Sequence, residues 1–121
     1  MKTRERVAGR PESILPLPHL YCPGCHHGSV FRLLGEIIDD LGIQEKTIGC
    51  MGVGCHAFGC FFLNTDVVSC LHGRAPSVAT GIKRSLYDKP VVFTIQGDGD
   101  LAAIGMGSIM NAAVRGEKLT T

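Results

Sequence analysis

Short apolar runs alternate with helical patterns along the chain, and this alternation limits the possible folds more than any other feature. The runs at 47–51, 67–71 and 91–96 are too short for stable helices and are flanked by Gly, Asp or Pro. We interpret each as a strand that is buried on both faces. Strands that alternate with helices predict an α/β fold with a mostly parallel sheet and flanking helices.

Three segments show helical periodicity. The first helix follows Cys25 and ends at Gly42, and its apolar positions recur every three or four residues: Val30, Leu33, Leu34, Ile37, Ile38 and Leu41. The second spans Pro76–Leu86, with Val78, Ala79, Ile82 and Leu86 on one face. The third spans roughly Leu101–Arg115. Residues 116–121 resemble a turn that leads into a further strand.

Length and composition favour one small domain or a piece of one, since the 121 residues are 45% hydrophobic. A net charge of +1, with no Lys/Arg stripe, argues against nucleic acid as a partner. No apolar run approaches the roughly 20 residues that span a bilayer, so no membrane association is expected. Residues 1–20 are rich in proline and predict an extended N-terminal arm before a domain at 21–121. Met1–Pro18 is unlike a secretory leader, and we expect a cytoplasmic protein.

The six cysteines are better explained as metal ligands or buried thiols than as disulfides, because the cytosol is reducing. Cys22 and Cys25 form a Cys-x-x-Cys pair that could hold one metal, and Cys55 follows a glycine-rich turn after a strand. Neighbouring histidines leave a zinc site open as an alternative: His26, His27 and His56. The remaining cysteines are interpreted as small buried side chains: Cys50, Cys60 and Cys70.

A second candidate site follows the strand at 91–96, where Gly97-Asp98-Gly99-Asp100 leads into a helix. Ligands bind at the carboxyl edge of strands in open α/β sheets. Gly97 and Gly99 allow phosphate oxygens to approach the backbone, and Asp98 offers a hard oxygen ligand for Mg²⁺. The helix N-terminus would add free amides for the anion. The turn therefore predicts a site for a metal-bound diphosphate.

Four motifs occur in an order that resembles the thiamine-diphosphate-binding β subunits of 2-oxoacid:ferredoxin oxidoreductases. They are Cys22-Pro23-Gly24-Cys25, Gly52-Val53-Gly54-Cys55, His72-Gly73-Arg74-Ala75-Pro76 with Ala79-Thr80-Gly81-Ile82-Lys83, and Gly97-Asp98-Gly99-Asp100. The resemblance covers about residues 20–121. It implies the N-terminal portion of such a subunit, and hence a thiamine-diphosphate-binding fold that lacks its C-terminal half and is inactive alone.

The resemblance also implies roles for individual residues. Cys22, Cys25 and Cys55 would ligate a [4Fe–4S] cluster, with the fourth cysteine beyond Thr121. Asp98 would bind Mg²⁺. The cofactor-binding neighbours would be Gly54, Gly97, Gly99, Asp100 and Leu101. His72 is a candidate catalytic residue near the cofactor, although a histidine that only bonds backbone there is an equal alternative. The residue after the family's third cysteine is usually serine, and His56 departs from that pattern.

The implied reaction is the oxidative decarboxylation of a 2-oxoacid to an acyl-CoA. Its partners would be coenzyme A, ferredoxin, and an α subunit with γ or δ subunits in some complexes. The motifs do not specify which 2-oxoacid is used. Two other hypotheses are a structural zinc module without catalysis and an electron-transfer protein without thiamine. Gly97-Asp98-Gly99-Asp100 argues against the second.

Overall fold

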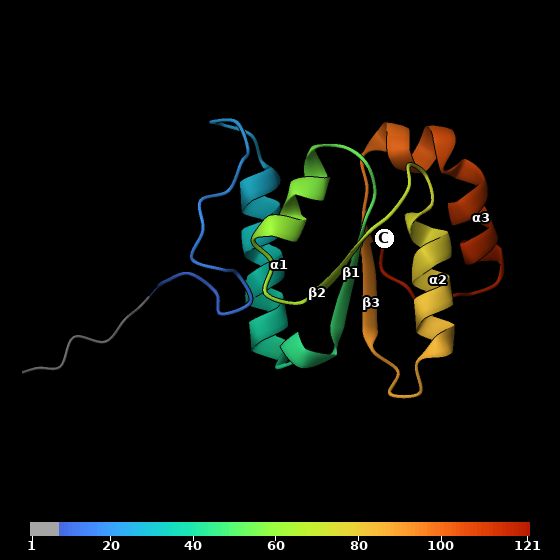
Figure 1. Cartoon of the computed structure of the whole chain (residues 1–121), viewed down its shortest axis with the longest axis horizontal. Coiled ribbons are helices and arrows are strands. Elements are labelled where there is room, and N and C mark those ends of the chain that lie inside the picture. The colour runs from blue at the N-terminus through green and yellow to red at the C-terminus, as the bar shows by residue number, and fades with distance from the viewer. Residues whose placement is uncertain (1–7) are drawn as a thin grey trace, which may run out of the picture.

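A computed structural model describes residues 8–121 and contains a three-stranded parallel sheet (Figure 1). The strands are β1 (Thr47–Met51), β2 (Asp66–Ser69) and β3 (Val91–Ile95), in the order β2-β1-β3. Gly49 of the central strand lies opposite Val67 and Phe93. The predicted α/β class with a mostly parallel sheet is confirmed. The expectation that every strand is buried on both faces is wrong for β2, because it is the edge strand and its residues are exposed or half-buried.

Helix α1 (His27–Leu41) ends where predicted, at Gly42, whose positive φ of 61° terminates the helix. Its buried residues are Phe31, Gly35 and Ile38. Four of the six periodic apolar residues are instead more than half exposed: Val30, Leu33, Ile37 and Leu41. The face of α1 that is buried therefore coincides only in part with the face predicted from the periodic apolar residues.

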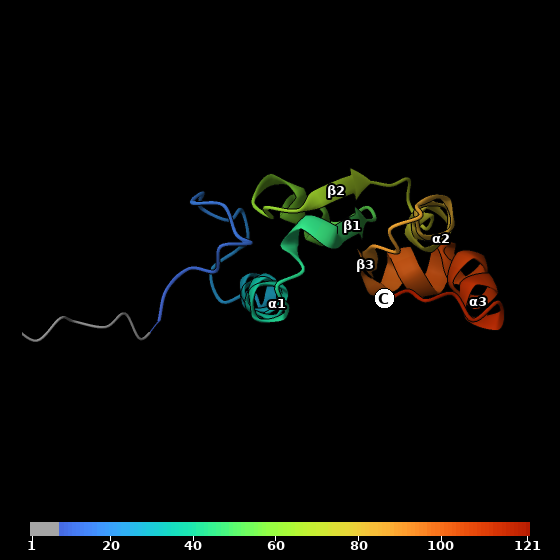
Figure 2. The same cartoon turned by 90° about the horizontal axis from the view of Figure 1, so that it is seen from below.

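Alternating residues of the strands build two cores, one on each face of the sheet. Figure 2 shows α1 and α2 (Ala75–Ser85) on opposite faces. The core on the α1 side contains Tyr21, Phe31, Met51, Phe62, Leu63 and Phe93. The core on the α2 side contains Cys50, Cys70, Ala75, Ala79 and Val92.

The segment after β3 departs from the single helix predicted at Leu101–Arg115. A π-helical segment, η3 (Gly99–Ile104), is followed by α3 (Met106–Val114), with Gly105 at the junction. Gly73 packs directly on this junction, because a Cβ on Gly73 would lie 2.8 Å from the Gly105 nitrogen. π-Helical turns inside helices often occur at functional sites. Here the junction lies next to the candidate site.

The described part of the arm lies against α1 and the loop before β2. Ile14 forms an antiparallel bridge with Leu63, and the Leu15 amide donates to the Phe62 carbonyl at 2.7 Å. Ser13 is fully buried, and its backbone amide donates to the Asp39 carboxylate of α1 at 3.0 Å. Residues 1–7 of the predicted arm lie outside the described residues.

A fourth strand position lies beside β3 at the end of the chain. Thr120 forms a parallel bridge with Phe93, and the Thr94 amide donates to the Thr120 carbonyl at 2.8 Å. This agrees with the expected turn into a further strand. Among residues 8–121, none of the helices has the length and apolar character needed to cross a membrane.

Candidate functional site

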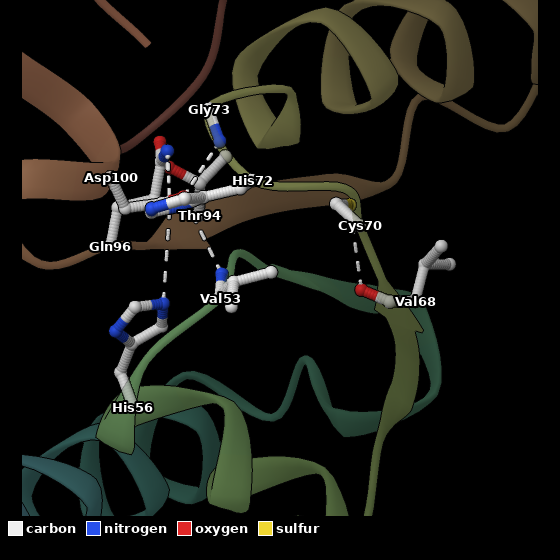
Figure 3. Close-up of polar contacts among 9 residues, drawn as sticks. All are labelled: Val53, His56, Val68, Cys70, His72, Gly73, Thr94, Gln96 and Asp100. Carbon is white, nitrogen blue, oxygen red and sulfur yellow. Dashed lines mark hydrogen bonds and ion pairs between the residues drawn. The ribbon is translucent and has the colours of Figure 1, made fainter. Parts of the chain in front are cut away.

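The loops that follow the three strands meet at the carboxyl edge of the sheet, because parallel strands all end on the same side. β1 leads into Gly52 and η2 (Cys55–Phe61), β2 leads into Cys70 and His72, and β3 leads into the turn before η3. Figure 3 shows side chains and amides from all three loops gathered around Asp100. This edge therefore brings together segments that are almost 50 residues apart in the chain.

Asp100 is the centre of this arrangement and is only 2% exposed. Its Oδ1 accepts hydrogen bonds from the Gly73 amide at 2.7 Å, from the Val53 amide at 3.4 Å, and from Nδ1 of His72. Its Oδ2 accepts a hydrogen bond from the Gln96 side chain at 2.7 Å. A buried carboxylate is stable only when it is hydrogen-bonded in this way. Asp100 thus fixes the three loops relative to one another.

The ionisation of Asp100 follows from the same contacts. Burial raises its pKa, but hydrogen bonds from Gly73, Gln96, His72 and Val53 more than compensate, and the pKa of Asp100 is lowered overall. The carboxylate is therefore ionised at neutral pH. It supplies a fixed negative charge beneath the turn at 97–101.

Two glycines permit the close approach of the loops to Asp100. A Cβ on Gly52 would lie 1.8 Å from Asp100 Oδ2, a distance that no side chain can adopt. A Cβ on Gly105 would lie 2.2 Å from the Asp100 carbonyl oxygen. Gly52 must therefore remain glycine for the carboxylate to fit, and Gly105 for the backbone of η3 to pass so close.

The predicted site residues Gly97, Asp98 and Gly99 form the turn that links β3 to η3. Asp98 is exposed, and a Cβ on Gly99 would meet nothing within 4 Å. The Leu101 amide donates to the Gly97 carbonyl at 2.8 Å and closes the turn. The turn thus presents a free carboxylate and open backbone to solvent, whereas the neighbouring Asp100 carboxylate is buried and hydrogen-bonded within the chain.

His72 and His56 lie on either side of Asp100. His72 is about half exposed, and its Nδ1 bonds the Asp100 carboxylate. The alternative expected from the sequence, in which His72 bonds only backbone, is therefore not what the structure shows. His56 is 3% exposed, and its Nε2 lies 3.9 Å from Asp100 Oδ2. Burial lowers the pKa of His56, the Asp100 carboxylate opposes that shift, and nearby His27 and His72 reinforce it.

The three predicted cluster ligands, Cys22, Cys25 and Cys55, are exposed. Cys22 and Cys25 lie in one tight turn, in which the Cys25 amide donates to the Cys22 carbonyl at 3.0 Å. The Cys25 sulfur also lies 3.0 Å from Nδ1 of His27. Within residues 8–121, no three Cys, His, Asp or Glu side chains are grouped closely enough to hold a metal ion. The structure therefore pairs Cys22 with Cys25 but does not gather the full ligand set.

Tyr21 connects the Cys25 turn to η2. Burial raises the pKa of the Tyr21 hydroxyl, and the nearby Cys55, Cys60 and Cys25 thiols raise it further. Cys25, Cys55 and Cys60 are thus all near enough to Tyr21 to act on its hydroxyl. Cys60, which the sequence suggested was buried, is only partly so, whereas Cys50 and Cys70 are buried as predicted.

Sequence reasoning missed the residues that organise the edge around Asp100: Gly52, Val53, Gly73 and Gln96. Gln96 offered one usable signal, because a polar side chain at the carboxyl end of a buried strand usually needs a specific partner. Gly52 and Gly73 belong to two of the four motifs. The close approach of Gly52 to Asp100 and of Gly73 to Gly105 depends on tertiary structure, which the motifs do not reveal. The motifs therefore located the site without revealing which residue holds it together.

The chain is similar in sequence to a family of thiamine pyrophosphate enzymes and to subunits of 2-oxoacid oxidoreductases. Residues 47–121 match the family described as thiamine pyrophosphate enzyme, C-terminal TPP binding domain. The ketoisovalerate oxidoreductase subunit VorA of Methanothermobacter marburgensis is 50% identical over 82% of this chain and 20% of its own length. The 2-oxoglutarate synthase subunit KorB of Methanocaldococcus jannaschii is 40% identical over 86% of this chain and 38% of its own length.

A solved structure has the same fold. It is 2-oxoglutarate:ferredoxin oxidoreductase from Magnetococcus marinus with 2-oxoglutarate, coenzyme A and succinyl-CoA bound. Its TM-score is 0.77 at 31% identity, over 84% of this chain and 35% of that chain. The chain thus spans between a fifth and two fifths of the length of these relatives. It belongs to the thiamine pyrophosphate enzyme family, and it is similar to subunits of 2-oxoacid oxidoreductases, in agreement with the resemblance that the motifs predicted.

Proposed function

We propose that the protein containing this chain oxidises a 2-oxoacid with thiamine diphosphate and passes the electrons through a [4Fe–4S] cluster to ferredoxin. The observation that carries the proposal is the Gly97-Asp98-Gly99 turn, which is held open at the sheet edge by the buried Asp100 network. The turn lies within the segment that matches the thiamine pyrophosphate family. The product would be an acyl-CoA, in line with the coenzyme A and succinyl-CoA bound to the structural relative.

The residues of the turn suit a magnesium-bound diphosphate. Asp98 offers an exposed carboxylate, the type of ligand that Mg²⁺ prefers. Gly97 and Gly99 lack side chains that would block phosphate oxygens, and the space around Gly99 is open. Leu101 lies in η3 directly after the turn and would border the diphosphate, and Gly54 directly precedes Cys55 and is a further cofactor-binding candidate. We therefore assign Mg²⁺ to Asp98 and the diphosphate to the backbone of the turn.

When bound, thiamine diphosphate supplies a nucleophilic carbon for attack on the ketone and holds the electrons left behind as carbon dioxide departs. The chain's own contribution is orientation and charge. The ionised Asp100 fixes Nδ1 of His72, so Nε2 is the atom of His72 that is free to hold a proton near the substrate. This supports the role predicted for His72.

Cys22, Cys25 and Cys55 would be cluster ligands. Their exposure and thiolate chemistry suit iron, and Cys25 and Cys55 both lie near Tyr21. We further propose that residues 1–20 act as an arm and 21–121 as part of the thiamine domain. The protein would work in the cytoplasm with α and, in some complexes, γ or δ subunits. A structural zinc module remains the alternative, and the 3.0 Å contact between Cys25 and His27 favours it.

The test is 2-oxoacid-dependent reduction of a viologen dye by the complete protein, purified anaerobically with its copurifying subunits. We expect reduction to require thiamine diphosphate, Mg²⁺ and coenzyme A, and to fail in Asp98→Ala. Iron and acid-labile sulfide near four of each per chain would support the cluster. Zinc near one, without dye reduction under any 2-oxoacid, would support the zinc module and contradict the proposal.

A further inference from the structure

His56 is a buried polar residue whose role the proposed function does not explain. It directly follows Cys55 and is 3% exposed. Its Nε2 is buried and has no hydrogen-bond partner within the described part of the chain. An unpaired buried polar atom is costly and rare in folded proteins, so a specific partner is expected for it.

The ring of His56 bridges two loops that the proposed function assigns to different cofactors. It lies against Gly54 of the loop that carries Cys55, because a Cβ on Gly54 would be 2.9 Å from His56 Cε1. It also lies near Gly97 of the Gly97-Asp98-Gly99 turn, called the thiamine turn below, because a Cβ on Gly97 would be 3.8 Å from His56 Nδ1. Figure 3 shows the ring directed from its loop toward Asp100, and Nε2 lies 3.9 Å from Oδ2 of that residue.

Asp100 Oδ2 can accept a second hydrogen bond. Among residues 8–121, Oδ2 accepts one hydrogen bond, from Gln96 at 2.7 Å, and a carboxylate oxygen has about two acceptor positions. A movement of about 1 Å would bring the imidazole nitrogen within hydrogen-bond distance of this oxygen. The carboxylate also selects the tautomer in which Nε2 carries the hydrogen.

We propose that His56 is a positioning residue that donates a hydrogen bond from Nε2 to Asp100 and so ties the Cys55 loop to the thiamine turn. The inference rests on the proposed function and extends it. Asp100 already accepts hydrogen bonds from the Gly73 loop and from Val53 at the start of the Cys55 loop, and His56 would add a second contact on the other side of Cys55.

The test uses three substitutions in the complete protein and measures thiamine diphosphate affinity by calorimetry in the presence of Mg²⁺. His56→Gln keeps a donor near the position of Nε2. His56→Asn carries the same amide one methylene shorter, and His56→Phe keeps the ring without a donor. We expect the Asn and Phe variants to weaken binding about tenfold or more and the Gln variant to stay within about threefold. Iron content should be unchanged in all three.

Two results would overturn the inference. Wild-type affinity in both the Asn and Phe variants would show that the donor is not needed. Equal loss in all three variants would show that the shape of the ring, and not the donor, is required. Failure of the wild-type protein to bind thiamine diphosphate would instead contradict the proposed function. The comparison of Gln with Asn remains decisive if the Phe variant does not fold, because the two differ only in reach.

Discussion

The thiamine turn and the Cys22–Cys25 turn lie in the same small domain but are built in opposite ways. The first rests on Asp100, a buried carboxylate that joins three loops through hydrogen bonds from backbone and side chains. The second is an exposed turn closed by one backbone hydrogen bond and one contact between sulfur and imidazole. Geometry is therefore fixed by the fold at the thiamine turn, whereas at the cysteines it depends on exposed side chains.

This difference predicts how substitutions divide between stability and binding. Changes around Asp100 should reduce the free energy of unfolding, because they leave buried polar groups unpaired or create overlaps. Changes at the exposed cysteines should leave stability nearly constant and affect only metal content. All of these substitutions are to be made and measured in the complete protein.

The largest effect on stability is expected for Gly52→Ala. The new Cβ would lie 1.8 Å from Asp100 Oδ2, so the carboxylate must leave its pocket or the loop must move. We expect a loss of about 3 kcal/mol or more in the free energy of unfolding, measured by urea denaturation.

Gly81→Ala is the matched control for this substitution. Gly81 lies in α2, and a Cβ there would meet nothing within 4 Å. Alanine should stabilise the helix by about 0.5–1 kcal/mol. Similar stability for the two alanine variants would refute the idea that the Asp100 pocket is rigid.

Asp100→Asn should have the next largest effect. In asparagine an NH₂ group replaces one of the two carboxylate oxygens. This NH₂ group cannot accept the hydrogen bond that Gly73, Val53 or Gln96 donates to that oxygen in the wild type. We expect a loss of about 2–3 kcal/mol, because the hydrogen bonds lost are to a charged group. Asp98→Asn should leave the urea midpoint unchanged, since Asp98 is exposed. A larger loss of stability in Asp98→Asn than in Asp100→Asn would contradict the conclusion that Asp100 holds the three loops together.

The contact between the arm and Asp39 of α1 should have an intermediate effect on stability, and this effect should depend on pH. Burial opposes ionisation of Asp39, but hydrogen bonds from Ser13 and Glu12 lower the pKa of Asp39 overall. The stabilisation is therefore complete above the ordinary carboxyl pKa of about 4 and is lost as the pH falls through the lowered value. Asp39→Asn should cost about 1 kcal/mol at pH 7, and this difference should shrink below about pH 4. A difference that does not change between pH 7 and pH 3 in thermal unfolding would exclude the proposed docking contact.

The smallest effect on stability is expected for Cys55→Ser, because the side chain is exposed. This variant should unfold within about 0.5 kcal/mol of the wild type yet lose most of its iron. Cys70→Ser is the control, since Cys70 is buried and is not a predicted ligand. It should keep its iron while losing about 1 kcal/mol of stability. Equal iron content in the two proteins would remove Cys55 from the ligand set.

The sequence predicted the parts of the fold that depend on local pattern. Gly42 ended α1 as expected, and the limits of β1 matched the apolar run at 47–51. The buried face of α1 was harder to predict, because it includes Gly35, which large apolar residues do not mark. Gly35 is buried because Ile14 of the arm lies against it, and a Cβ there would be 2.7 Å from the Ile14 side chain.

The candidate site was predicted in outline for a similar reason. Gly97, Asp98 and Gly99 form a contiguous motif, so their turn could be located from the sequence. Asp100 was expected to border the cofactor, a prediction that stays untested, but its internal network depends on contacts with residues 27 to 47 positions away. Local pattern cannot reveal such contacts. The break between η3 and α3 has the same cause, because Gly73 packs on Gly105 across the fold.

We propose above that the turn around Asp98 binds thiamine diphosphate through Mg²⁺. The most direct measurement is calorimetric titration of the complete protein with thiamine diphosphate, with and without Mg²⁺, for the wild type and Asp98→Ala. We expect Mg²⁺-dependent binding by the wild type and at least about tenfold weaker binding by the variant, with the same melting temperature for both. Equal affinity in the two proteins, or binding that does not depend on Mg²⁺, would contradict it.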